Sequence, residues 1–457
     1  MTEAGHAPKP RYFTHPRELP EGAEVLVYGA GGRGRSFLRS MKTHGSGLKA
    51  VGFLDSFKPG RAEGLPVHPV SELPELLRAH GAVRPVIVVA SYYHKAIGEE
   101  LARRGVTDYH VLLEECEAIP YLDLPDEEAL GMLNARKHPL NAHPKDTRAR
   151  DGRRFRCMSL TALYLRPTGF SLCCWMPDLV HATDPARALS RLDGIRRRLI
   201  GGIDRGECPF CASCPELVPT ANPVDTDKVT LLHMDTSTTC NLACSYCNVK
   251  DSMPRCDYDP QAVFGLLREE GRLAPSYSFD WGGFGEPSIN PHFGPITRLM
   301  LDDGASGLVY SNALVRSPVI EQGLAAGKLT IVCSVDAGTR ETYRAVRNVD
   351  AFEAVWKNIA AYVRLNPELV RIKYIVTPGN AGREETDAFV ERCAESGVRH
   401  VTIAKDFFSR RTPAPVREGV RNLALECARR GLEYTFLPTA IGPAFVRSLK
   451  LGKPSPE

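Results

Sequence analysis

The chain has 457 residues, of which 43% are hydrophobic, so it is long enough for several domains with ordinary buried cores. Fifty-eight basic against 54 acidic residues leave a formal net charge of +4, which gives no electrostatic basis for nucleic-acid binding. No stretch approaches the roughly 20 apolar residues of a membrane span, and the first residues lack the apolar segment of a secretion signal. We therefore expect a cytoplasmic protein with no nucleic-acid or membrane partner.

Residues 1–123 are predicted to form a small Rossmann-like domain. The segment EVLVYGAGGRGRSFLRSM is typical of a strand, a glycine turn and a helix, and KAVGFLDS and PVIVVASYYH indicate two more buried strands. Gly29, Gly31 and Gly34 have G-x-G-x-x-G spacing, and Asp55 ends the next strand. In a Rossmann unit such glycines permit a tight turn beside a pyrophosphate, and the acidic residue binds a ribose hydroxyl.

The same N-terminal segment resembles the Rossmann-like domain at the front of certain sugar acyltransferases and polysaccharide-biosynthesis enzymes. That resemblance implies a nucleotide or nucleotide-sugar ligand more often than NAD. The alternative is a scaffold domain with an empty cleft, because one fold hosts many functions. His94, which follows the third strand, is a further candidate ligand contact, with a surface loop histidine as the alternative.

A polar linker is expected at residues 124–152, followed by a cysteine-rich domain at 153–224. Nine of the fourteen cysteines fall between residues 157 and 247. In a chain without a secretion signal, metal or cluster ligation explains this crowding better than disulfides do. The segment CPFCASC places Cys208, Cys211 and Cys214 in one tight loop, for which a structural zinc site is the alternative.

Residues 225–457 alternate regularly between strand and helix patterns. The six strand candidates are VTLLHMD, YSFDWGG, GLVYSN, LTIVCSV, RIKYIV and HVTIAK. This alternation predicts parallel βαβ units with right-handed crossovers, and hence an open or closed α/β barrel. Sites in such barrels lie at the carboxyl ends of the strands. We therefore expect the segments that follow the first and second strands to meet at one site.

Three cysteines follow the first of these strands directly, in the segment STTCNLACSYCN. Cys240, Cys244 and Cys247 have C-x3-C-x2-C spacing, with the aromatic Tyr246 before the last. This motif resembles the signature of the radical SAM superfamily. The resemblance implies a partial (β/α)6 barrel and a [4Fe–4S] cluster whose three irons are held by thiolates, while the fourth binds S-adenosylmethionine (SAM). Zinc binding is the alternative.

Later strand ends resemble further elements of the same family. GGFGEP resembles its glycine-glutamate motif, in which glycine lets the backbone approach the methionine part of SAM, and YSNA resembles its ribose-contacting element. SVDAG resembles its fourth strand end, which places Ser334 and Asp336 on one face and Cys333 outward. IKYIVTPGN resembles the strand that packs on adenine. The implied SAM-contact residues are Tyr246, Gly282, Gly283, Gly285, Glu286, Ser311, Asn312 and Ser334.

The cysteine-rich segment resembles the opening of a SPASM auxiliary-cluster domain, in which a glycine turn brings two cysteines together. Two features depart from that family: the segment precedes the barrel, and its second half is C-x2-C-x2-C. A second, incompletely ligated cluster and a structural zinc knot remain open as alternatives. The implied ligands of one auxiliary [4Fe–4S] cluster are Cys157, Cys174, Cys208, Cys211 and Cys214, with Cys173 as the spare thiol.

Together these resemblances imply an enzyme that cleaves SAM reductively to a 5′-deoxyadenosyl radical and abstracts hydrogen from a substrate C–H bond. Analogy with the N-terminal domain favours epimerisation or dehydrogenation of a sugar or nucleotide-linked metabolite. A peptide-modifying maturase is the first alternative, and a non-catalytic iron–sulfur electron carrier is the second. A reducing partner such as flavodoxin or ferredoxin is expected, and the substrate is expected to be a small molecule or a peptide.

Overall fold

The structure is a computed structural model, and the chain divides into two compact units. One unit comprises Met1–Leu124, Trp175–His181 and Asp251–Pro254, and the other comprises Pro125–Cys174, Ala182–Lys250 and Arg255–Glu457. The predicted linker at 124–152 lies largely outside the described residues, and the domain boundaries stay predictions. The described residues are 10–13, 16, 19–43, 47–56, 59–81, 84–91, 94–112, 130, 133–134, 145–150, 153–167, 169–173, 176, 178–220, 227–247, 256, 258–283, 285–406, 412–438 and 440–451.

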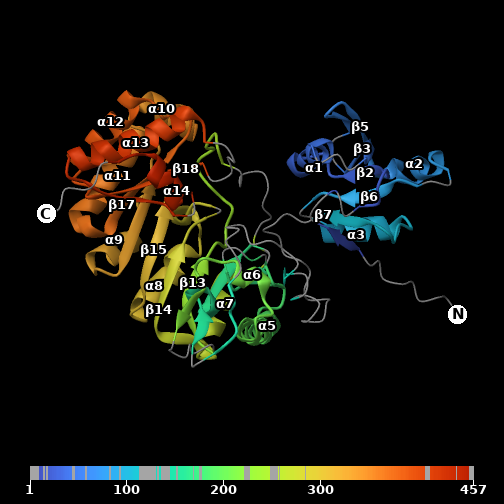
Figure 1. The fold of residues 1–457 in the computed structure, drawn as a ribbon, viewed down its shortest axis with the longest axis horizontal. Helices are drawn as coiled ribbons and strands as arrows, with labels where there is room; N and C mark the ends of the chain where they lie inside the picture. Colours follow the sequence, from blue (N-terminus) through green and yellow to red (C-terminus); the bar gives the residue numbers. More distant parts are fainter. Residues whose placement is uncertain are drawn as a thin grey trace. The chain divides into compact units, whose positions relative to one another are not determined.

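The first unit contains a sheet of strand order β1-β7-β6-β2-β3-β5-β4, drawn in blue in Figure 1. Its strands are Arg11–Phe13 (β1), Glu24–Tyr28 (β2), Lys49–Asp55 (β3), Gly60–Ala62 (β4), Leu65–Pro69 (β5), Val86–Val89 (β6) and His110–Leu112 (β7). Its helices are Gly32–Thr43 (α1), Leu73–Ala79 (α2) and His94–Arg103 (α3), with the short 3-10 helix Val70–Glu72 (η2). Strand β2 pairs in parallel with β3 on one side and β6 on the other, so the strand order reverses at β2.

The second unit contains a larger sheet with the order β10-β9-β13-β14-β15-β16-β17-β18-β19. Every neighbouring pair from β9 to β19 is parallel, whereas β9 and β10 form an antiparallel hairpin. The strands of this sheet are Ala162–Arg166 (β9), Gly169–Ser171 (β10), Val229–Met234 (β13), Leu273–Trp281 (β14), Ser306–Ser311 (β15), Leu329–Ser334 (β16), Val370–Val376 (β17), His400–Lys405 (β18) and Glu433–Phe436 (β19). Arg154–Arg156 (β8) and Val218–Thr220 (β12) pair in a separate two-stranded sheet. Val180–His181 (β11) belongs to the first unit.

All six strands predicted in the second half form, as β13 to β18. The mixed α/β class is confirmed, whereas closure into a partial (β/α)6 barrel stays a prediction. The helices are Pro185–Arg205 (α5), Pro209–Ala212 (α6), Pro260–Glu269 (α7), Phe293–Asp302 (α8), Pro318–Ala325 (α9), Arg340–Arg347 (α10), Phe352–Leu365 (α11), Arg383–Glu395 (α12), Ala414–Arg429 (α13) and Pro443–Ser448 (α14), with 3-10 helices Met158–Thr161 (η4), Pro287–Ile289 (η5) and Pro367–Leu369 (η6).

Strand β17 alternates between a fully buried face and a face that is open to a cavity. In β17, Ile372, Tyr374 and Val376 have no exposed surface, whereas Lys373 and Ile375 line the cavity. This is the period-2 alternation of a strand whose two faces meet different surroundings. Cys333 on β16 belongs to the buried face, as its predicted outward direction requires.

Helix α10 is capped at both ends, and a carboxylate of α12 also holds its first turn. Thr339 caps the first turn by accepting from the Thr342 N–H at 3.3 Å. The Glu385 carboxylate of α12 accepts from the Thr339 N–H at 3.2 Å and from the Thr339 and Thr342 hydroxyls at 2.9 and 3.0 Å. Asn348, in the left-handed conformation at φ 58°, ends the helix. These contacts fix the position of Arg347, the last residue of the helix.

Within the part of the chain that the structure describes, none of the helices is both long enough and apolar enough to cross a membrane.

Candidate functional site

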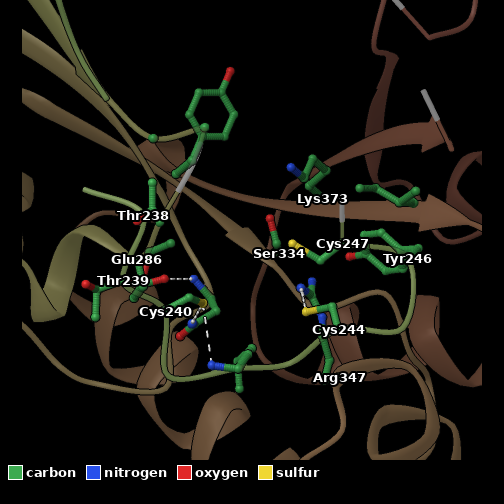
Figure 2. Close-up of a pocket in the computed structure, with 18 of the residues that line it drawn as sticks. Thr238, Thr239, Cys240, Cys244, Tyr246, Cys247, Glu286, Ser334, Arg347 and Lys373 are labelled. Carbon is green, nitrogen blue, oxygen red and sulfur yellow. Dashed lines mark hydrogen bonds between the residues drawn. The ribbon is translucent and has the colours of Figure 1, made fainter. Parts of the chain in front are cut away.

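A cavity of about 600 Å³ lies at the carboxyl ends of the parallel strands in the second unit. Its wall comes from the ends of β13 to β17, the segments after β14, β18 and β19, and the cysteine loop that follows β13. Figure 2 shows the three cysteines of this loop around the same cavity. Among the residues that line it are all the SAM-contact candidates of the sequence together with the three cysteines: Cys240, Cys244, Tyr246, Cys247, Gly282, Gly283, Gly285, Glu286, Ser311, Asn312 and Ser334.

The cysteine loop is held by hydrogen bonds to both its backbone and its sulfur atoms. Cys240 and Cys247 are exposed and Cys244 is partly buried. The Leu242 N–H donates to the Cys240 sulfur at 3.4 Å, and Arg347 Nη1 donates to the Cys244 sulfur at 3.3 Å. Hydrogen bonds to the ligand atoms of a metal site fix the orientation of those ligands. The donor set therefore fits an iron–sulfur cluster held by three thiolates.

The described residues contain no group of three or more His, Cys, Asp or Glu side chains arranged to hold a single metal ion.

The glycines after β14 are required by backbone conformation and by close packing. Gly282 and Gly283 have φ values of 148° and 120°, which disfavour residues with a Cβ atom. At Gly285, a Cβ atom would lie 2.4 Å from the Ser237 carbonyl oxygen and 2.8 Å from that of Thr239. The Glu286 N–H also donates to the Thr239 carbonyl at 2.9 Å. The end of β14 is thus packed directly against the backbone that leads into the cysteine loop.

Glu286 is buried and connects the ends of β14 and β15. Its Oε1 accepts from the Ser288 N–H at 3.1 Å, the Ser288 hydroxyl at 2.7 Å and the Ser311 hydroxyl at 2.8 Å. Its Oε2 accepts from the Asn312 N–H at 2.7 Å. The Asn312 amide in turn donates to Asn241 Oδ1 at 2.7 Å, so this cluster also orients the cysteine loop. Three SAM-contact candidates, Glu286, Ser311 and Asn312, therefore belong to one hydrogen-bonded cluster.

A buried ion pair lies beneath the cysteine loop. Arg347 Nη2 is 2.6 Å from Asp336 Oδ2, and the two residues are 4% and 0% exposed. Burial alone would lower the pKa of Arg347, but Asp336 outweighs it, and the pKa is raised. The Tyr246 hydroxyl also donates to Asp336, and burial together with this carboxylate raises the pKa of Tyr246. Asp336 Oδ1 accepts from the Ile375 N–H at 2.6 Å, which joins the pair to β17.

Sequence analysis missed a second charged group on the cavity face of β13 and β14. His233 Nε2 is 2.6 Å from Asp235 Oδ2, and His233 Nδ1 contacts Asp280, its register partner on β14. The Tyr164 ring lies 4.7 Å from the imidazole, centroid to centroid. Burial lowers the pKa of His233, but the two carboxylates outweigh it and raise the pKa to about 10. The two carboxylates therefore favour the protonated imidazole. A histidine inside an otherwise apolar strand was the available signal.

The auxiliary cysteines gather around two antiparallel pairings. Strands β9 and β10 form a hairpin, and β8 pairs with β12, which brings the chain before Cys157 beside the chain after Cys214. Burial raises the pKa of Cys157 to about 12, and the nearby thiols of Cys173 and Cys214 add to the rise. Lys145 Nζ braces the loop by donating to the Cys214 and Leu217 carbonyls, each at 2.6 Å.

Not every predicted auxiliary ligand can be placed. Cys208, Cys211 and Cys214 are buried together in and beside α6. Cys174 lies outside the described residues, whereas its neighbour Cys173 is described and lies near Cys157. The choice of Cys174 as ligand and Cys173 as spare stays a prediction.

In the first unit, two of the three glycines in the turn are needed by the backbone, whereas the third has open space around it. Gly29 has φ 113°, and at Gly34 a Cβ atom would lie 1.9 Å from the Gly29 carbonyl oxygen. A Cβ atom at Gly31 would have no neighbour within 4 Å. Asp55 Oδ2 accepts from the Ala30 N–H at 3.2 Å, so this carboxylate orients the turn itself. His94 is the first residue of α3, and a nucleotide ligand stays a prediction.

Among known proteins, solved structures resemble a part of this chain. No protein-family model matches the chain, and no curated protein matches it. The crystal structure of Streptococcus suis SuiB bound to precursor peptide SuiA is 16% identical, with a TM-score of 0.38, over 46% of this chain and 49% of that chain. Native anSMEcpe with bound AdoMet and Cp18Cys peptide is 16% identical, with a TM-score of 0.37, over 45% and 62%. TYW1 with a lysine-pyruvate adduct bound is 16% identical, with a TM-score of 0.29, over 42% and 68%.

These neighbours are radical SAM enzymes, the family that the cysteine motif resembles. The chain spans about half the length of SuiB and 62% of that of anSMEcpe. At this low identity and TM-score, the likeness by itself establishes neither an activity nor a substrate. The functional interpretation therefore depends on the residues of the site.

The first prediction concerns the protonation of His233. Because its pKa of about 10 lies above the value of about 6.5 in an unfolded chain, His233 contributes stability that is fully present below pH 6.5 and is lost as the pH rises through 10. The stability difference between wild type and His233→Gln should shrink over this window, by up to about 1.4 kcal/mol per pH unit. Urea unfolding at several pH values measures it.

The charge of His233 can also be measured directly in the wild-type protein, so this test does not depend on the stability of His233→Gln. NMR of wild-type protein with 15N-labelled histidine side chains should show one imidazole that is still protonated at pH 8. His292→Gln, at the partly exposed N-cap of α8, is the matched control and should keep this signal. If every imidazole is neutral at pH 8, the carboxylates do not hold a cation in this wall.

Proposed function

We propose that the protein is a radical SAM enzyme whose cavity binds SAM beside a [4Fe–4S] cluster. The observation that supports this best is the convergence of three cysteines and eight SAM-contact candidates, from separate strand ends, on one cavity. A cluster that binds SAM supplies the electron for its reductive cleavage to a 5′-deoxyadenosyl radical, which abstracts hydrogen from a substrate C–H bond.

The residues around the cavity are positioned to hold these ligands before they bind. Arg347 and the Leu242 N–H orient two of the thiols, and the cluster of hydrogen bonds around Glu286 fixes the loop against β14 and β15. Groups that orient metal ligands in this way tune both affinity and geometry.

For the substrate, we propose a sugar or nucleotide-linked metabolite that is epimerised or dehydrogenated. The N-terminal resemblance supports this choice, and a cavity of about 600 Å³ is within the usual range for small-molecule sites. A peptide-modifying maturase and a non-catalytic iron–sulfur electron carrier are the alternatives. Deuterated nucleotide-sugars and deuterated peptides distinguish them, because only the true substrate transfers deuterium to 5′-deoxyadenosine. A carrier would form no 5′-deoxyadenosine from SAM.

We also propose an auxiliary [4Fe–4S] cluster in the cysteine-rich segment and a flavodoxin or ferredoxin as the electron donor. Four of the five predicted ligands are among the described residues and are brought near one another by two pairings and a braced loop, which supports a shared cluster. An auxiliary cluster could accept the electron that remains on the substrate after hydrogen abstraction, which makes the net reaction an oxidation.

The second prediction tests SAM cleavage. Changing Cys240, Cys244 or Cys247 to Ala should reduce 5′-deoxyadenosine formation below detection in anaerobic, dithionite-reduced enzyme, because each thiolate holds one iron. Chromatography of the quenched reaction measures the product. Cys256→Ala, which removes a cysteine outside the motif, should retain activity. Wild-type product levels in all three motif variants would exclude the radical SAM proposal.

The third prediction separates the two clusters. Wild-type protein should carry about eight irons, and a variant with Cys240, Cys244 and Cys247 all changed to Ala should retain about four, because the two sites use different thiolates. Iron analysis and the visible charge-transfer absorption measure this. Cys157→Ala should lose the auxiliary iron, whereas Cys173→Ala should be mild. Stoichiometric zinc without iron in the triple variant would replace the auxiliary cluster with a structural zinc site.

The fourth prediction concerns the N-terminal unit. Because a side chain at Gly31 meets open space, Gly31→Val should leave the fold intact but weaken binding of a nucleotide or nucleotide-sugar at the turn. Calorimetry against a panel of these ligands measures binding, and SAM cleavage should be unchanged. Gly34→Val is the structural contrast and should lower the melting temperature, since its side chain would collide with the Gly29 carbonyl. No binding by wild type would favour a scaffold role.

A further inference from the structure

Lys373 places an amine in the cavity from the cavity-facing side of β17. Its register partner on β16 is Ser334, and both residues line the cavity together with Tyr310. Lys373 Nζ lies 5.4 Å from the centroid of the Tyr310 ring. Figure 2 shows Lys373 across the cavity from Glu286 and Thr239, with its nitrogen toward the interior. The amine therefore lies between the Tyr310 ring and the interior of the cavity.

The other charged side chains of this cavity wall have partners within the protein. Arg347 pairs with Asp336, His233 lies between two carboxylates, and Glu286 accepts four hydrogen bonds. Asp406, also in the wall, has an interaction of its own. Lys373, by contrast, has no side-chain hydrogen bond or ion pair with any residue that the structure describes.

Lys373 is partly buried in this wall. Burial lowers the pKa of Lys373, although the charge of the more distant Asp336 opposes the shift. An ammonium group that is partly withdrawn from water and has no hydrogen-bonded counter-charge is a suitable partner for an anion that enters the cavity. Lysine presents a compact point charge with three donors, which suits the oxygens of a carboxylate or a phosphate.

We propose that Lys373 is the anion-binding residue of this cavity and holds a carboxylate or phosphate group of the substrate that occupies it beside SAM. This inference rests on the proposed function, because it assigns part of the same cavity to a second molecule. The position of Lys373 across the cavity from Glu286, a SAM-contact candidate, favours the substrate as the source of the anion (Figure 2). The carboxylate of SAM is the other source with this chemistry.

The test uses anaerobic protein with its iron–sulfur content restored and without reductant. Lys373→Met removes the charge at similar volume, Lys373→Arg retains it, and Lys357→Met on the exposed face of α11 is the matched control. Inorganic phosphate and acetate are the probes, each titrated with and without SAM at constant ionic strength. Ligand-dependent thermal stabilisation measures their affinity. Calorimetry measures the affinity for SAM and for decarboxylated SAM, which lacks the carboxylate.

If Lys373 binds a substrate anion, Lys373→Met should weaken phosphate or acetate binding about tenfold or more, as expected for a lost charge-assisted hydrogen bond. Lys373→Arg should lose less, Lys357→Met should lose nothing, and SAM affinity should be unchanged. A loss of affinity for SAM but not for decarboxylated SAM would assign the anion site to SAM. Unchanged affinity for all four ligands in Lys373→Met would overturn the proposal.

The design separates this proposal from the proposed function. If SAM binds neither wild type nor variants, the radical SAM assignment fails. The titrations of phosphate and acetate without SAM still report whether Lys373 binds anions. If SAM binds and is cleaved but Lys373→Met changes no affinity, only the role of Lys373 fails.

Discussion

The buried ion pair between Arg347 and Asp336 is the interaction on which the site depends most. Arg347 is the last residue of α10, and Asp336 follows β16, so the pair joins two segments that are separate in the sequence. The same two side chains also reach the Cys244 sulfur, the Tyr246 hydroxyl and the backbone of β17. Removal of either partner would leave an uncompensated charge in the interior, which is strongly destabilising. The pair therefore holds the part of the cysteine loop that contains Cys244 and Tyr246.

Much of the fold around this site could be predicted from the sequence. The six strands from β13 to β18 were predicted because each is a short apolar run between helical segments. The carboxyl ends of parallel strands share one edge of a sheet, so the meeting of Cys240, Gly285 and Ser311 at one cavity also followed from their positions. Strand β19, which extends the parallel sheet at one side, was missed, and it is short. Strand β9 was expected only as one arm of a glycine hairpin, and its parallel pairing with β13 was missed.

The residues that sequence analysis missed are those whose chemistry depends on partners from other segments. Asp280 on the next strand contacts His233 and favours its protonated form, and no sequence spacing gives that register. Lys373 differs from an ordinary surface lysine only because its strand faces a cavity. Arg347 ends the helix that follows β16, and its contact with Cys244 spans 103 residues of chain. For His233 and Lys373, the available signal was a charged residue inside a mostly apolar strand.

The close packing of Gly285 against the Ser237 and Thr239 carbonyls has a consequence for how this chain can change over time. A side chain at 285 requires a shift in the backbone before Cys240, so substitutions at the two places are coupled and must occur together to be tolerated. Such coupling slows divergence at these positions while the surrounding strands and helices vary. Distant relatives of this chain should therefore be recognisable by the joint presence of the cysteine loop and this glycine, even where overall identity has been lost.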